Sequence, residues 1–143
     1  MARIVVGVDG SSSSEEALVW AADEAKLRNA SLHIVHSWVL PPMPSSIEML
    51  EQLKGHEISE MSQQLLDDAA ASVADRGIEI TTELSNDSPA EGLIRAAQDA
   101  DLLVVGSRGR GGFKGLLLGS VSQHCAHYAP CPLVIVRRPS KAD

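Results

Sequence analysis

The chain has few aromatic residues and few positive charges. It contains two Trp, one Tyr and one Phe, and its 12 Lys and Arg stand against 19 Asp and Glu, for a formal net charge of −7. A nucleic-acid surface needs clustered cations and rings that stack against bases. We therefore expect no nucleic-acid partner, and we expect any anionic ligand to be held by a local arrangement of donors.

Cysteines and long apolar runs are also scarce. Two cysteines, Cys125 and Cys131, do not supply a disulfide framework for a chain of 143 residues, so reduced thiols are expected. The longest apolar stretches have the length of a strand, well short of the roughly 20 residues of a membrane span. An expected strand follows Met1 almost directly, which is not the pattern of a signal peptide. These features predict a cytoplasmic protein with no membrane partner.

What the chain does contain is a regular alternation of strand and helix patterns. Its length suits one domain, residues 1–143, which would bury about 68 to 70% of the surface of the unfolded chain. Strictly alternating β and α units imply right-handed crossovers. We predict an α/β fold, a doubly wound, Rossmann-like open sheet of five parallel strands flanked by helices. The expected strands span residues 3–9, 32–38, 78–84, 102–105 and 133–136.

Polar residues before the apolar stretches predict where helices begin. The segments Ser12–Glu15 and Ser120–Gln123 have the form of a capping box, in which Ser is followed three residues later by Glu or Gln. Ser88 precedes Pro89, a pairing typical of an N-cap and the first helical position. Residues 78–84 alternate apolar with polar or charged side chains, so the third strand should be half exposed and lie at a sheet edge.

A glycine-spaced segment follows the fourth strand. Gly106, Gly109 and Gly119 have the spacing G-x2-G-x9-G, and Ser120 comes next at the start of the last helix. Ligands of open α/β sheets sit at such strand ends, where glycine lets backbone N–H groups approach an anion and a helix adds the positive end of its dipole. The segment is neither a Walker loop nor a G-x-G-x-x-G dinucleotide fingerprint. We therefore predict a phosphate site of another kind.

Two cations, Arg108 and Arg110, would add charge to this site. A flexible solvated loop over residues 107–118 is one alternative, although long structureless loops inside compact domains are uncommon and usually functional. The run Arg108–Gly112 also resembles a short RNA-binding tract, but a single copy in an acidic chain gives that interpretation little support.

Asp9 ends the first expected strand. If that strand lies beside the fourth, the carboxylate comes next to the glycine segment at the topological switch point. There it would hydrogen-bond a ribose or hold Mg²⁺ against phosphates. The alternative is an Asx turn that leads into the first helix.

Ligand-type side chains gather near the C-terminus, at His124, Cys125, His127 and Cys131. Zinc is disfavoured, because in a helix Cys125 points about 100° away from His124. We expect a buried structural thiol and partly exposed histidines. The last strand, residues 133–136, is wholly apolar and would be an aggregation hazard at a bare edge. Either a second copy of the chain or its own helices and C-terminal tail should cover it.

Three segments together closely resemble the universal stress protein family: Val5–Ser11, Leu32–His36 and Val104–Ser122. The likeness covers essentially the whole chain, and the complete G-x2-G-x9-G-Ser spacing is similar to the nucleotide-binding branch of that family. The resemblance implies a small stress-response or signalling module that binds ATP with Mg²⁺ and forms homodimers through Leu133–Val136. A slow ATPase or phosphotransferase, or a binder of another adenine nucleotide such as cyclic AMP, is the alternative function.

The nucleotide-binding residues that we expect from the glycine segment and the resemblance are Gly7, Asp9, Val39, Leu40, Gly106, Ser107, Arg108, Gly109, Arg110, Gly111, Gly112, Gly119, Ser120, Val121 and Ser122. Asp9 is also the candidate ligand of Mg²⁺. The sequence shows no catalytic base beside the phosphate site.

Overall fold

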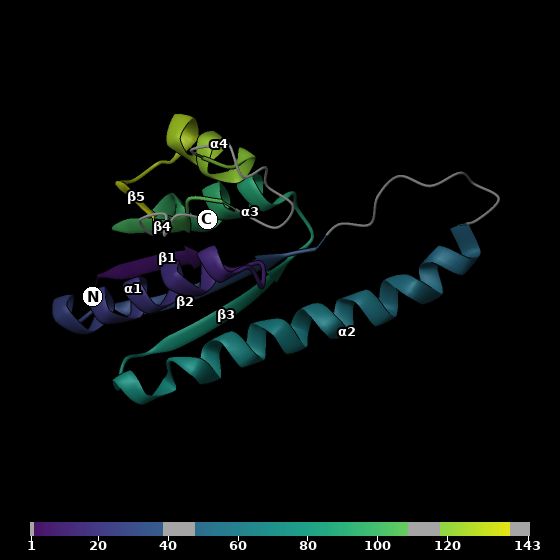
Figure 1. Ribbon diagram of the computed structural model, residues 1–143, viewed down its shortest axis with the longest axis horizontal. Helices are drawn as coiled ribbons and strands as arrows, with labels where there is room; N and C mark the ends of the chain where they lie inside the picture. The colour runs from purple at the N-terminus through teal and green to yellow at the C-terminus, as the bar shows by residue number, and fades with distance from the viewer. Residues whose placement is uncertain (1, 39–47, 109–117, 138–143) are drawn as a thin grey trace, which may run out of the picture.

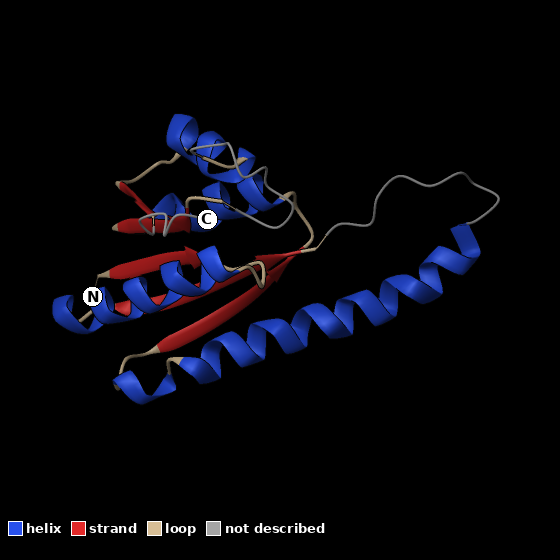
Figure 2. Cartoon of the chain, viewed as in Figure 1, coloured by secondary structure: helices blue, strands red, loops and turns tan. Residues whose placement is uncertain are grey.

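The computed structural model describes residues 2–38, 48–108 and 118–137, and for residues 48–58 the backbone alone. In these ranges, strands form one sheet in the order β3-β2-β1-β4-β5 (Figures 1 and 2). Every pair of neighbouring strands is parallel. The predicted α/β fold with a parallel five-stranded sheet is therefore confirmed. The strands are β1 (Arg3–Gly7), β2 (Ser31–Ser37), β3 (Ile80–Ser85), β4 (Leu102–Gly106) and β5 (Leu133–Val136).

Helices cover both faces of the sheet, as the doubly wound arrangement requires. In Figure 1, α2 runs beside β3, and its first turns extend beyond the sheet. None of the helices in the described ranges is both long and apolar enough to cross a bilayer. The helices are α1 (Ser12–Arg28), α2 (Glu48–Ser72), α3 (Pro89–Ala96) and α4 (Ser120–Tyr128), with short 3-10 turns at η2 (Ala74–Arg76) and η3 (Ala97–Asp99).

The sheet divides the apolar core into two halves, because successive side chains of a strand point to opposite faces. Ile4 and Val6 of β1 are fully buried in the half beneath α1 and α2. Val5, between them, is fully buried in the half that contains Leu93 of α3 and Cys125 of α4. The continuous apolar runs in the sequence are thus strands buried on both sides.

The two edge strands differ in character. β3 lies at one edge and is half exposed, as its alternating sequence predicts, although it begins two residues later than expected, at Ile80. β5 lies at the other edge and its four residues are partly buried.

The start of α1 corrects one predicted cap. The N-cap is Ser11 and not Ser12, since Ser11 keeps an extended backbone, with φ −77° and ψ 158°. Its Oγ accepts a hydrogen bond from the backbone N–H of Ser14 at 3.2 Å, and the Ser14 hydroxyl donates to the Ser11 carbonyl at 3.0 Å. The partner three residues on is therefore Ser14, and the capping box with Glu15 was wrong by one position.

The other two predicted N-caps, those of α4 and α3, can be compared with the structure in the same way. The N-cap of α4 also lies one residue before the predicted one, because Gly119 is the N-cap and Ser120 the first helical residue. α3 begins as predicted, with Ser88 at the N-cap and Pro89 at the first position.

Candidate functional site

The carboxyl ends of β1 and β4 lie side by side in the middle of the sheet. The chain leaves β1 for β2 on one side, while β4 pairs with β1 on the other, with Val6 opposite Val104. This is the topological switch point at which open α/β sheets bind ligands. The sequence predicts Asp9 next to the start of the glycine segment on the condition that β1 lies beside β4. The structure confirms that these two strands pair.

Gly106, at the end of β4, packs directly against the first turn of α1. A β-carbon at this position would lie 2.5 Å from the Oγ of Ser13 and 2.7 Å from its carbonyl oxygen. The backbone N–H of Arg108 then donates to the Oγ of Ser13 at 3.2 Å. Glycine is therefore needed here so that β4 and α1 can approach each other closely.

Gly7, at the end of β1, has a similar packing role on the opposite face of the sheet. A β-carbon there would come within 2.8 Å of the Leu93 side chain of α3. The two glycines of the expected site that end these strands thus bring helices close to the strand ends, from both sides of the sheet.

The N-terminus of α4 is anchored to the segment that follows β4. The backbone N–H of Gly119 donates to the carbonyl oxygen of Ser107 at 2.7 Å. The hydroxyl of Ser122 lies 3.1 Å from the same oxygen and 3.0 Å from the carbonyl oxygen of Gly119, and it donates to both. Because Ser122 is only 2% exposed, its hydroxyl holds the loop and the helix together. Ser120 is exposed and Val121 half-buried, so solvent reaches both residues.

Asp9 forms a local turn at the start of α1. Its Oδ1 accepts hydrogen bonds from the backbone N–H of Ser11 at 2.9 Å and from the Ser11 hydroxyl at 2.5 Å. The backbone N–H of Asp9 donates to the Oγ of Ser14 at 3.2 Å. The Asx turn considered from the sequence is therefore present, and it fixes the carboxylate at the end of β1.

His36 supports the same turn, a role that the sequence analysis did not predict. The Nδ1 atom of its ring lies 2.7 Å from the carbonyl oxygen of Val8, to which it must donate a hydrogen. The only available signal was the place of His36 near the end of the second strand, beside β1. The contact depends on the register of β1 and β2, which periodicity does not specify.

Several residues of the expected site lie outside the described ranges, and the structure places none of them: Val39, Leu40, Gly109, Arg110, Gly111 and Gly112. The site described above is therefore formed by the segments that flank them.

Among the residues that the structure describes, no three or more His, Cys, Asp or Glu side chains lie close enough together to hold a metal ion. Cys125 is fully buried, and burial raises the pKa of its thiol to about 11. Cys131 is partly buried, and its pKa is raised by burial and then by the negative charge of Asp101. His124 and His127 are exposed. The prediction that Cys125 is buried is confirmed.

Comparison with known proteins places this fold and these motifs in one family. The model of the "Universal stress protein family" matches residues 1–137. A universal stress protein of Mycobacterium tuberculosis strain H37Rv is 38% identical over 140 residues, which cover 95% of this chain and 45% of that protein. One from Mycolicibacterium smegmatis is 37% identical over 147 residues, covering 97% and 49%. The chain therefore spans about half the length of these relatives.

Solved structures agree with this assignment. Universal stress protein UspA from Lactobacillus plantarum superposes with a TM-score of 0.83 at 22% identity, covering 95% of this chain and 97% of that one, which shows the shared fold. A universal stress protein in complex with cyclic AMP superposes with a TM-score of 0.68 at 30% identity, covering 94% and 95%. The chain belongs to the universal stress protein family.

Proposed function

We propose that residues 1–143 form one domain that binds ATP with Mg²⁺ at the carboxyl ends of β1 and β4, as a cytoplasmic stress-response or signalling module. The observation that supports this most strongly is that two helix N-termini meet at the end of β4. The contact of Ser13 with Gly106 holds the start of α1 against the end of β4. The hydrogen bond from Gly119 to Ser107 holds the start of α4 there. The first N–H groups of a helix lack intrahelical partners and carry partial positive charge, so together they favour phosphate.

Different described residues would contact different parts of the nucleotide. The start of α4, at the exposed Ser120 and the half-buried Val121, would offer backbone N–H groups to phosphate oxygens. Arg108 would supply a cation directly after β4. Asp9, fixed by its turn, has the carboxylate chemistry that Mg²⁺ takes alongside phosphate oxygens, and the same carboxylate suits a ribose hydroxyl.

A charge placed at the start of α4 tests this site without disturbing the packing. Ser120→Asp puts a carboxylate at an exposed first helical position, where the helix dipole favours it. The added negative charge would repel the phosphates of ATP, so Ser120→Asp should lower ATP affinity about tenfold or more. The matched control is Ser88→Asp, which adds the same charge at the exposed N-cap of α3. Equal ATP affinity of the two variants in calorimetric titrations would exclude the start of α4 from the site.

Cyclic AMP is the second candidate ligand, because a solved structure 30% identical to this chain is in complex with it. A cyclic monophosphate carries one phosphate and leaves most of a triphosphate site empty. Competition between ATP and cyclic AMP therefore separates the two. ATP should displace cyclic AMP at lower concentration, and Ser120→Asp should weaken ATP more than cyclic AMP. The opposite order of affinities would make cyclic AMP the ligand.

We also propose that the chain forms a homodimer through β5. The carbonyl oxygen of Pro132 accepts a hydrogen bond from Leu103 of β4, and that of Val136 accepts one from Ser107, just after β4. By alternation the N–H and carbonyl groups of Ile135 point away from the sheet. An unpaired apolar edge favours strand pairing with a second copy. Ile135→Pro removes one outward N–H while sparing the bonds to β4. Sedimentation should show a dimer for the original chain and a monomer for Ile135→Pro, and a variant that stays dimeric would refute this interface.

A further inference from the structure

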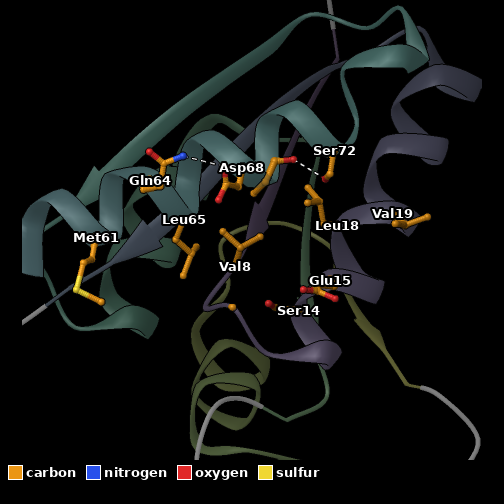
Figure 3. Close-up of a pocket in the computed structure, with 12 residues that line it drawn as sticks. Val8, Ser14, Glu15, Leu18, Val19, Met61, Gln64, Leu65, Asp68 and Ser72 are labelled. Atoms are coloured by element: carbon orange, nitrogen blue, oxygen red, sulfur yellow. Dashed lines mark hydrogen bonds between the residues drawn. The ribbon is translucent and has the colours of Figure 1, made fainter.

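A pocket lies between α1 and α2, on the face of the sheet that these helices cover. It has a volume of about 710 Å³, and Figure 3 shows side chains from both helices around it. This volume falls in the range of about 300 to 1,000 Å³ that is usual for small-molecule sites. The residues that line it are Val8, Gly10, Ser14, Glu15, Leu18, Val19, Met61, Gln64, Leu65, Asp68, Ala69 and Ser72.

The walls of this pocket are mostly apolar. Leu18 of α1 is buried at its inner side, while Val19 is 43% exposed and Met61 of α2 is 72% exposed. Val19 and Met61 are two of the few large apolar side chains of the described ranges that stand this far out of the core, and they flank the same hollow. Apolar surface that is left open and rimmed by polar groups is typical of a binding site.

The charged groups of the pocket all have one sign. Its charged lining residues are Glu15 on α1 and Asp68 on α2, and the described lining contains no Lys, Arg or His. The whole chain adds to this field, with a formal net charge of −7. The Oδ1 of Asp68 accepts a hydrogen bond from the side-chain amide of Gln64 at 2.8 Å, which orients the carboxylate at the rim. An apolar hollow between two carboxylates complements an apolar body with a positive charge.

We propose that the pocket between α1 and α2 binds a small amphiphilic cation, that is, a compact apolar molecule that carries an ammonium group. This ligand differs in charge from the nucleotide proposed above. The pocket is lined by Gly10, which precedes α1, and by Ser14 of its first turn, but it presents acidic groups instead of unpaired N–H donors. The proposal does not depend on nucleotide binding, and it is tested on protein without nucleotide.

Three probes of one shape separate the contributions of charge and apolar surface. We would titrate ¹⁵N-labelled protein with 1-adamantylammonium, 1-adamantanol and 1-adamantanecarboxylate and follow the backbone amide signals. The ammonium should bind saturably and shift signals of α1 and α2 around Leu18 and Leu65. The alcohol should bind about two- to fivefold more weakly, because an exposed carboxylate adds only modest attraction, and the carboxylate probe should bind most weakly. Absence of saturable ammonium binding, or equal affinity for the three probes, would overturn the proposal.

Two neighbouring aspartates provide a matched pair of charge variants. Asp67 and Asp68 each accept a hydrogen bond from a Gln four residues earlier, at 2.9 and 2.8 Å, but only Asp68 lines the pocket. Asp68→Asn should weaken ammonium binding about two- to fivefold and leave the alcohol unaffected, whereas Asp67→Asn should change neither. Equal effects of the two substitutions would show that the attraction comes from the net charge and would refute the site.

A steric pair tests the apolar wall. Ala69→Phe fills the pocket from α2 and should abolish binding of both the ammonium and the alcohol, while Ala71→Phe, on an exposed part of the same helix, should not. Binding that survives Ala69→Phe in a folded protein would overturn the assignment. If Ala69→Phe does not fold, the Asp68 and Asp67 pair decides the question.

Discussion

Gly106 and Ser13 are in such close contact that no larger residue fits at position 106. A β-carbon there would lie 2.5 Å from the Ser13 Oγ and 2.7 Å from the Ser13 carbonyl oxygen, which belongs to the backbone and cannot rotate away. The contact fixes the start of α1 against the end of β4, so it sets the geometry of the proposed nucleotide site.

Gly106→Ala should therefore destabilise the fold. The added methyl group overpacks the contact, and we expect the free energy of unfolding to fall by about 1 to 3 kcal/mol in urea titrations. A loss of nucleotide binding in this variant would not by itself locate the ligand, which is why Ser120→Asp is the better binding test. Unchanged stability of Gly106→Ala would contradict the observed packing.

Two serines at the start of α4 should respond differently to loss of the hydroxyl. Ser122 is buried and its hydroxyl donates to the carbonyl oxygens of Ser107 and Gly119, so Ser122→Ala should lower the free energy of unfolding by about 0.5 to 1.5 kcal/mol. Ser120 is exposed, and Ser120→Ala should change stability by less than about 0.5 kcal/mol. Equal effects in denaturant titrations would refute the anchoring role of Ser122.

Asn29, after the last turn of α1, adopts a left-handed conformation with φ 55° and ψ 44°. Its backbone N–H bonds to carbonyl oxygens of the last turn, so this conformation ends the helix. Asn29→Ala should cost about 1 kcal/mol in thermal or urea unfolding, because Ala resists positive φ. Asn29→Gly should be tolerated, since glycine accepts this region. A Gly variant less stable than the Ala variant would rule out backbone conformation as the reason for Asn29.

The buried thiol of Cys125 should make stability depend on alkaline pH. Burial raises its pKa from 9.0 to about 11, so between these values the folded chain keeps a proton that the unfolded chain releases. The contribution of Cys125 to the free energy of unfolding should therefore be fully present below pH 9 and decrease as the pH rises toward 11. Cys125→Ala should show a smaller fall over this interval, because other groups that titrate there are unchanged. The same slope in both proteins would contradict the buried thiol.

Alkylation checks the same environment chemically. In native protein, iodoacetamide should modify the partly buried Cys131 first and Cys125 only after unfolding. Asp101→Asn should speed modification of Cys131, because the negative charge of Asp101 raises the pKa of that thiol.

The sequence predicted the fold well because each element carries its own pattern. The apolar run of β4 and the alternation of β3 indicated a covered strand and an edge strand, and both were confirmed. The predicted helix starts were less accurate where several serines follow one another. Ser11 and Ser12 are equivalent as sequence, and the choice between them depends on hydrogen bonds among Asp9, Ser11 and Ser14.

Contacts between distant segments were beyond prediction. The fit of Gly106 on Ser13, the hydrogen bond from His36 to Val8 and the pocket between α1 and α2 all depend on strand register or helix packing. Local periodicity does not encode these distances. The spacing of glycines predicts a ligand site after β4, and that site stays a prediction, while the structure shows that Gly106 is needed for packing against Ser13.

The most direct test of the account is a calorimetric titration of nucleotide-free protein with ATP, with and without Mg²⁺, alongside the Ser120→Asp and Ser88→Asp variants. If the start of α4 holds phosphate, the original chain and Ser88→Asp should bind ATP saturably in the micromolar range, and Ser120→Asp should bind about tenfold or more weakly. No saturable binding of ATP would contradict it, and the glycine segment would then serve a purely structural role.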